Sequence, residues 1–213
     1  SASVVTPEQA PTLPEQALAA LWQRGRLAYK LHDAQRELRN LFMDSTSRIT
    51  VWNIARRFGK STLLCMLAVE HALKTHNGRV VFAAPTREQA RDIVSPIFRH
   101  VLEDCPDHLK PKYNESRNFY HFESTGCEVH IDGADDERGA RLRGTKATLV
   151  LGDECGFWRY PVEVIKSVLL PQTITCNGRI IIASTPPESP HHAFWQLVAE
   201  ARIGGSYEQR TIY

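Results

Sequence analysis

The sequence predicts an α/β fold in which a mainly parallel central sheet is flanked by helices. Runs of mostly apolar residues recur at 79–86, 147–154 and 178–187. Strands that helices cover on both faces read this way, whereas half-exposed strands alternate apolar and polar residues. Segments with helical spacing separate the runs, and parallel strands need such crossover connections. A chain of 213 residues is long enough for one α/β domain of good size.

The N-terminal part is expected to be a flexible arm followed by helices. Residues 1–16 are rich in Pro, Ala, Gln and Thr, a composition typical of disordered arms. Leucines recur at helical spacing over 15–43, which predicts helix there. A short β-rich run follows at 48–54. An apolar-striped helix is then expected at 62–75, with Gly78 as its stop.

The middle of the chain combines a bent helix with a hairpin. Residues 87–105 read as a helix that bends or restarts at Pro96, because proline lacks the N–H that a helix interior needs. Residues 118–124 and 127–133 alternate apolar and polar side chains. This alternation predicts a β-hairpin with its turn near Gly126.

The C-terminal part continues the alternation of helices and strands. Helices are expected at 160–173 and 191–203, on either side of the apolar strand 178–187. Residues 207–213 are expected to begin one more strand.

Composition excludes several classes of protein. Hydrophobic residues make up 42% of the chain and charged residues 23%, as in an ordinary globular domain. A net charge of +2 is too small to indicate nucleic-acid binding by itself. No apolar run is long enough to span a membrane, so no membrane association is expected. The five cysteines are scattered without a C-x-x-C pair, which argues against a disulfide scaffold or a zinc site.

A candidate phosphate-binding loop follows the strand 48–54. Such loops read G-x-x-x-x-G-K-S/T, and Gly59, Lys60 and Ser61 match the end of this pattern. Ile54 stands where the first glycine should fall, and two arginines occupy positions where small residues are common. Backbone N–H groups at the start of the following helix would bind phosphate. The alternative is a helix N-terminus that reads G-K-S by coincidence.

The roles of the loop residues follow from phosphate chemistry. Lys60 would reach the β- and γ-phosphates of a nucleotide, and the Ser61 hydroxyl would ligate Mg²⁺. Gly59 and Thr62 complete the expected nucleotide-binding set on this loop.

Two adjacent carboxylates follow the buried strand 147–154. Asp153 and Glu154 lie at the carboxyl end of this strand, where open α/β sheets bind ligands. Asp153 would hold the hydration shell of Mg²⁺, and Glu154 would orient and deprotonate the attacking water. Read alone, the pair is equally well explained as two solvated loop acids.

Two further signals accompany the loop and the carboxylates. The strand 178–187 contains two hydroxyl residues, Ser184 and Thr185, where helicase-like ATPases sense the γ-phosphate. A strand end that caps a turn is the alternative. Gln35, upstream of the first strand, is placed to read adenine through its amide, although a lone glutamine on a helix is usually solvated.

In their order, these segments resemble the ATPase domain of the large terminase subunit of tailed bacteriophages, the motor that packages DNA. The resemblance covers roughly 30–200. It rests on the adenine-motif-like LHDAQREL, the Walker-A-like ARRFGKS, the arginine-glycine segment ARLRGTK, the Walker-B-like LVLGDECGF and the coupling-motif-like IIIASTPP. The order and spacing of all five make the match specific.

The resemblance implies a P-loop NTPase of the ASCE/RecA-like class over 17–213, hydrolysing ATP with Mg²⁺. In this family an arginine early in the loop contacts the γ-phosphate in cis, which by position is Arg56, with Arg57 as the nearby alternative. The unusual loop is therefore interpreted as a variant rather than a broken motif. Ring motors of this kind also use an arginine from the neighbouring subunit, for which Arg143 and Arg141 are the candidates, with Arg138 behind them. These arginines could equally bind DNA phosphates or lie in solvent.

The resemblance also implies partners and a location. Double-stranded DNA would be translocated into a procapsid by a homo-oligomeric ring docked on the portal protein and assisted by the small terminase subunit. This would occur in the cytoplasm of the infected bacterial host. A nuclease domain should follow the ATPase domain in the family; the sequence ends at Tyr213, so no nuclease activity is expected from this chain.

Two alternatives and one departure from the family pattern remain. A superfamily-2 helicase-like DNA translocase would use similar motifs, although two arginines in the loop disfavour it. A nucleotide-binding regulator with little turnover is the other alternative. Gly152 stands before Asp153 where a bulky apolar residue is usual, which predicts a looser end to that strand.

Overall fold

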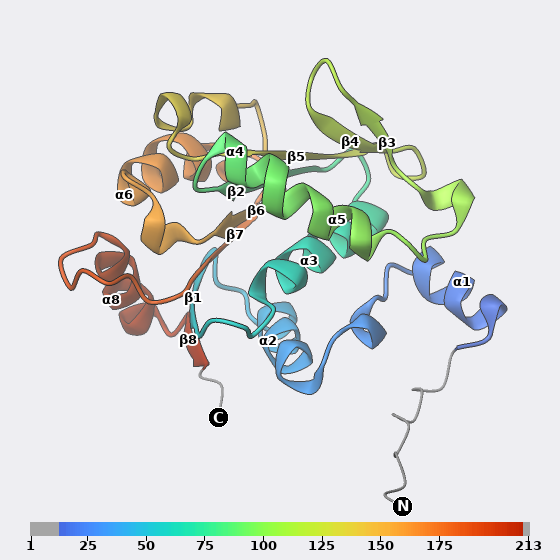
Figure 1. The fold of residues 1–213 in the computed structure, drawn as a ribbon, viewed down its shortest axis with the longest axis horizontal. Coiled ribbons are helices and arrows are strands. Elements are labelled where there is room, and N and C mark those ends of the chain that lie inside the picture. The colour runs from blue at the N-terminus through green and yellow to red at the C-terminus, as the bar shows by residue number, and fades with distance from the viewer. Residues whose placement is uncertain (1–12, 211–213) are drawn as a thin grey trace, which may run out of the picture.

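The computed structural model describes residues 13–210, and Figure 1 shows how their elements are arranged. These residues form an eight-stranded sheet with the order β3-β4-β5-β2-β6-β7-β1-β8. All neighbours from β5 to β8 pair in parallel, and β4 and β3 add an antiparallel edge. The predicted fold class, a mainly parallel sheet flanked by helices, is confirmed.

The strands are β1 (Ile49–Ile54), β2 (Arg79–Ala84), β3 (Lys112–Asn114), β4 (Phe119–Phe122), β5 (Cys127–Gly133), β6 (Leu149–Asp153), β7 (Arg179–Ser184) and β8 (Tyr207–Arg210). The longer helices are α1 (Glu15–Gln23), α2 (Asp33–Asp44), α3 (Lys60–Lys74), α5 (Ser95–Val101) and α8 (Phe194–Gly204). Shorter α-helical pieces are α4 (Arg87–Gln89), α6 (Pro161–Glu163) and α7 (Leu170–Ile174). The 3₁₀ turns are η1 (Ala28–Lys30), η3 (Asp107–Leu109), η4 (Asp136–Leu142) and η5 (Cys155–Phe157), and the π-helical segments are η2 (Ala90–Val94) and η6 (Val164–Leu169).

Each of the strands expected from the sequence is present, and the hairpin turns at Gly126 as predicted. Strand β3 was not predicted, because its three residues are mostly exposed and carry no apolar pattern. The predicted arm 1–16 falls largely outside the described residues, and α1 already begins at Glu15, so the arm ends earlier than expected. Of the predicted last strand, 207–210 forms β8 and 211–213 lie outside the described residues.

The helical region 15–43 is broken rather than continuous. Gly25, at φ +62°, follows α1, and a Cβ there would lie 2.7 Å from the Cγ of Lys74. The left-handed residue after α3 is Asn77 and not the expected Gly78. Asparagine tolerates this conformation because its short polar side chain bonds locally.

Each π-helical segment ends immediately before a pair of residues whose second member is proline. Segment η2 precedes Ser95 and Pro96, and η6 precedes Leu170 and Pro171. Proline has no N–H and clashes with the carbonyl four residues earlier, so a wider turn accommodates it without ending the helix. The bend predicted at Pro96 is thus a local change of helix type.

Helices cover both faces of the sheet, because successive strand residues point to opposite sides. In β7, Ile181 and Ala183 pack into the core with α3 and α5, whereas Ile180 and Ile182 pack into the core with η6 and α8. The parallel strands are therefore buried on both faces, which explains their continuous apolar runs.

The predicted loosening at Gly152 is wrong. Gly152 is buried and pairs with both Ala83 and Ile182. A Cβ on this glycine would lie 2.9 Å from the Cδ1 of Ile182 and 3.0 Å from the indole of Trp158. Trp158 fills the space that a bulky residue would take, and its Nε1–H donates to the Asp153 carbonyl at 3.0 Å.

Candidate active site

The phosphate loop lies between β1 and α3. Gly59 is the N-cap of α3 and has φ +85°, a left-handed conformation that glycine adopts without the cost of a Cβ. A Cβ at this position would also lie 2.6 Å from the Nε2 of Gln35. Two independent constraints therefore require glycine here. Arg57 is left-handed as well, at φ +65°.

Helix α2 holds this loop through two consecutive carbonyls. Gln35 Nε2 donates to the Gly59 carbonyl at 2.9 Å, and His32 Nε2 donates to the Phe58 carbonyl at 2.8 Å. The other ring nitrogen of His32, Nδ1, accepts from the Gln35 backbone N–H at 3.2 Å, which fixes the tautomer. The Gln35 carbonyl oxygen accepts from the His32 backbone N–H at 3.0 Å. Buried Gln35 is thus engaged at both amide atoms, and its expected contact with adenine remains a prediction.

The carboxyl ends of β1, β6 and β7 meet at one edge of the sheet, with β7 between the other two. This brings the start of α3 to Asp153. The Ser61 hydroxyl donates to Asp153 Oδ2 at 2.6 Å, and Lys60 Nζ lies 3.6 Å from Asp153 Oδ1. Burial raises the pKa of Asp153, while Lys60 and the Ser61 hydrogen bond act in the opposite direction.

Glu154 turns back over this edge toward β7. Its backbone is left-handed at φ +53°. Its carboxylate forms an ion pair with Lys60 and accepts hydrogen bonds from the Thr185 hydroxyl at 3.1 Å and the Thr185 N–H at 3.4 Å. The two expected sensor residues differ: Ser184 is fully buried and accepts from the Gly156 N–H at 2.9 Å, whereas Thr185 faces the site.

A cavity of about 330 Å³ lies over these groups. Its walls include seven of the residues predicted from sequence, namely Arg56, Arg57, Lys60, Ser61, Asp153, Glu154 and Thr185. Thr62, in the first turn of α3, and buried Ser184 do not line it. Sequence reasoning missed Gln89, Ile93 and Val94, which close the cavity from α4 and η2. No motif marks them, because only the tertiary fold brings this helix over the loop.

The three arginines proposed to act in trans do not line this cavity. Arg141 and Arg143 line a separate cavity of about 510 Å³ beside Arg79 and Lys146, near the amino ends of β2 and β5. Arg138 lies 3.6 Å from the Glu163 carboxylate and stacks over Tyr160, with 4.6 Å from its guanidinium carbon to the ring centroid. Their role in a neighbouring subunit remains a prediction.

The donor set around Asp153 fits a divalent cation that also binds phosphate. Asp153 Oδ1 is buried and has no hydrogen-bond partner, so one carboxylate oxygen is left for such an ion. Within residues 13–210 there is no cluster of three or more His, Cys, Asp or Glu side chains that could hold a metal ion. Mg²⁺ usually takes only one or two carboxylates and completes its shell with waters and substrate phosphates.

No helix within residues 13–210 is long and apolar enough to cross a membrane.

Solved structures of phage large terminases share this fold. The chain is 18% identical to the large terminase of bacteriophage HK97, with a TM-score of 0.73 over 92% of this chain and 43% of that one. The chain is 23% identical to the large-terminase ATPase domain of Thermus phage P74-26, with a TM-score of 0.60 over 81% of this chain and 70% of that one. It is 14% identical to a large terminase of a thermophilic bacteriophage in complex with ADP, with a TM-score of 0.65 over 84% of this chain and 44% of that one. The chain thus spans less than half the length of the first and third of these proteins.

The family model described as terminase large subunit, T4likevirus-type, N-terminal, matches residues 51–205. This range contains most of β1, the phosphate loop, both carboxylates and β7, and it is well over half of the chain. The chain therefore belongs to the terminase large-subunit family, and its fold is that of the ATPase domain of a phage large terminase.

Proposed function

We propose that this chain hydrolyses ATP with Mg²⁺ and that hydrolysis drives double-stranded DNA into a procapsid. One observation carries the proposal: Lys60, Ser61, Asp153, Glu154 and Thr185 converge on one cavity at the carboxyl edge of the sheet. These residues supply the charges and hydrogen bonds that phosphoryl transfer requires.

The loop would bind the nucleotide phosphates. The backbone N–H groups at the start of α3 and the positive end of the helix dipole favour anions. Lys60 and the exposed Arg56 would neutralise the β- and γ-phosphates, with Arg57 as the alternative cis arginine. Ser61 and Asp153 would hold Mg²⁺, which neutralises negative charge on the transferring phosphate when it is bound.

Glu154 is the proposed general base. A carboxylate accepts the proton of the attacking water, and its hydrogen bonds to Thr185 fix its direction. The ion pair joins Glu154 to the lysine that also binds phosphate. Phosphate oxygens would compete with Glu154 for Lys60, so nucleotide binding would leave the carboxylate available for water. Thr185 would thereby connect the γ-phosphate state to β7.

The remaining partners are proposed from the family. Arg141 and Arg143 lie away from the cavity of their own subunit, so any part they take in ATP hydrolysis would be at the cavity of a neighbour. A ring of identical subunits with head-to-tail contacts would bring such a surface to the next active site. We infer a homo-oligomeric ring on the portal protein, with the small terminase subunit, in the cytoplasm of the infected bacterial host.

A nucleotide-binding regulator is the second candidate, and the Lys60–Glu154 ion pair favours it because the pair engages the proposed base. Steady-state ATP hydrolysis separates the two. We expect Glu154→Ala to lower kcat by about 10²–10⁴-fold, the contribution usual for a general base, while ATP binding is retained. Glu188→Ala, an exposed carboxylate beyond β7, is the matched control. The rates are measured over a range of protein concentrations.

Each outcome bears on a different part of the proposal. A specific rate that rises with concentration would support an arginine supplied by a neighbouring subunit. Hydrolysis by Glu154→Ala at the wild-type rate would remove Glu154 as the base. ATP binding without measurable turnover in the wild type at every concentration would favour the regulator. Strand separation of a duplex would favour the helicase-like translocase.

A further inference from the structure

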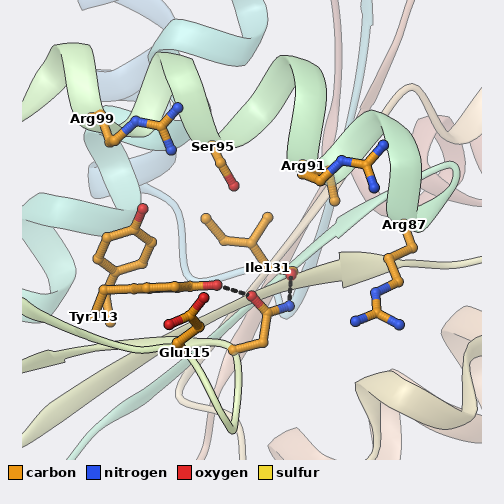
Figure 2. A pocket seen from close by; sticks show the side chains of 10 residues that line it. Arg87, Arg91, Ser95, Arg99, Tyr113, Glu115 and Ile131 are labelled. Carbon is orange, nitrogen blue, oxygen red and sulfur yellow. Dashed lines mark hydrogen bonds between the residues drawn. The ribbon is translucent and has the colours of Figure 1, made fainter.

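Three arginines form a row along one side of the helix that follows β2. Arg87 lies in α4, Arg91 in η2 and Arg99 in α5, and we call them the arginine row. They line a groove of about 520 Å³ whose opposite wall includes Tyr113 and Tyr120. Figure 2 shows the arginines and Ser95 spaced along the helix above Ile131, with Tyr113 and Glu115 across the groove.

The spacing of the row depends on the π-helical segment. Residues four apart in an α-helix drift around its axis, because one turn takes 3.6 residues. The wider turn of η2 reduces this drift between Arg87 and Arg99, so all three side chains line the same groove. At about 1.5 Å per residue the row is about 18 Å long, with Arg87 and Arg91 about 6 Å apart along the axis.

Most of the charge in this groove is positive and accessible. All three arginines are exposed. Arg91 pairs with Asp92 at 2.8 Å, whereas within residues 13–210 Arg87 and Arg99 have no carboxylate at ion-pair distance. Glu115 is the acidic residue that lines the groove.

The opposite wall is held in place by hydrogen bonds. The Tyr113 hydroxyl donates to Asn118 Oδ1 at 2.5 Å, and Asn118 Nδ2 donates to the Ile131 carbonyl at 3.2 Å (Figure 2). Tyr113 is 51% exposed, which leaves an aromatic surface beside the arginines. A row of exposed guanidinium groups is typical of surfaces that follow a nucleic-acid backbone, whereas an exposed aromatic ring is a surface on which an unpaired base can stack.

We propose that the arginine row binds the phosphodiester backbone of DNA; this rests on the proposed function, which requires DNA. Phosphates on one strand advance about 3.4 Å along the duplex axis, so the row spans about five phosphates and Arg87 and Arg91 span about two. Bidentate guanidinium–phosphate contacts suit this arrangement. Contacts of this kind read no sequence, as a packaging motor requires.

The same helix also touches the nucleotide cavity. Gln89, Ile93 and Val94 line the cavity that contains Lys60, and Arg87, Arg91 and Arg99 line the groove. A shift of this helix with the nucleotide state would therefore move the arginine row. The wider turn of η2 contributes residues to both surfaces, and such turns recur at functional sites.

The test is binding of a fluorescein-labelled 30-base-pair duplex by fluorescence anisotropy at several salt concentrations, in the 213-residue chain. The variant is R87Q/R91Q/R99Q. The control is R24Q/R26Q/R202Q, which removes three exposed charges outside both cavities. We expect the row variant to bind at least about tenfold more weakly and to lose about three from the slope of log K against log salt. Binding of a fluorescent ADP analogue should be unchanged in both variants.

The proposal is overturned if the row variant keeps wild-type DNA affinity and slope, as it would if the groove bound an acidic protein. It is also overturned if the control loses as much affinity, because net charge would then explain the loss. Loss confined to R141Q/R143Q/K146Q would place DNA at the other basic cavity instead. In each of these cases, ATP hydrolysis by the wild type would still support the proposed ATPase function, so the two proposals can fail separately. The same titration with single-stranded DNA tests which form of DNA the row binds. Tighter binding to the duplex supports the proposal, and tighter binding to single strands contradicts the proposal that the row binds double-stranded DNA.

Discussion

Two turns at the same sheet edge carry the candidate catalytic groups, and they are held in different ways. After β1 the chain reverses at Gly59, and after β6 it reverses at Glu154, both with left-handed backbones. The first turn is fixed through its carbonyls, which accept hydrogen bonds from His32 and Gln35. The second is fixed through its own side chain, which bonds to Thr185 and pairs with Lys60.

The difference follows from what each turn must present. A phosphate cradle is made of backbone N–H groups, so a side chain at Gly59 would serve no purpose and would meet Gln35. A general base must be a side chain, so the second turn keeps glutamate despite a backbone cost of about 1–2 kcal/mol. Interactions of the Glu154 carboxylate offset part of that cost. A Cβ at positive φ should therefore cost free energy at both turns, in nucleotide binding at Gly59 and in the stability of the fold at residue 154.

The largest effect is expected from Gly59→Ala. A Cβ at φ +85° and 2.6 Å from Gln35 Nε2 must distort the loop or displace the glutamine. We expect a loss of about 2 kcal/mol or more in nucleotide binding, which is about a thirtyfold weaker affinity. Titration with a fluorescent ADP analogue measures it. Gly204→Ala is the control, because its Cβ would lie 3.9 Å from the nearest atom, and it should bind as the wild type does. Equal affinity of the two variants would show that the loop tolerates a side chain.

A smaller effect is expected from Gln35→Ala, which removes the hydrogen bond to the Gly59 carbonyl. One such bond contributes about 0.5–1.5 kcal/mol, so nucleotide affinity should fall about fivefold. If Gln35 only positions the loop, ATP and GTP should weaken by the same factor. If it reads adenine, ATP should weaken more and the preference for ATP over GTP should fall. Gln196→Ala, an exposed glutamine on α8, should change neither affinity.

Much of the site was predictable because its chemistry is local in sequence. Lys60 and Ser61 begin the helix that follows β1 after a short loop, and Asp153 ends β6, so parallel pairing within one sheet brings them to one edge. The apolar runs predicted that pairing because both faces of the strands are buried. The loop could be predicted although Ile54 replaces the first glycine of the motif, because the glycine that takes the left-handed N-cap of α3 is Gly59, which is present.

The rest depended on tertiary contacts that no local pattern encodes. Val94 and Ile93 close the cavity because α4 and η2 cross over the loop, which spacing along 87–105 does not indicate. The order of the motifs likewise did not show that Arg141 and Arg143 line a cavity near the amino ends of β2 and β5. Strand β3 was missed for another reason: it is short and exposed, so burial left no trace in its composition.

The smallest expected effect separates the backbone of the second turn from its side chain. Glu154→Ala and Glu154→Gly both remove the bonds to Thr185 and the ion pair with Lys60, so they differ only in what a Cβ costs at φ +53°. The glycine variant should be the more stable by up to about 1 kcal/mol, because relief of the left-handed strain exceeds the extra entropy of an unfolded glycine. Urea unfolding of the two variants measures the difference. At Ser167, in the helical η6, the same pair of substitutions should rank the other way, since glycine costs about 0.5–1 kcal/mol there. If alanine is also the more stable residue at 154, the turn is not strained, and the side-chain bonds of Glu154 then serve only to aim the carboxylate.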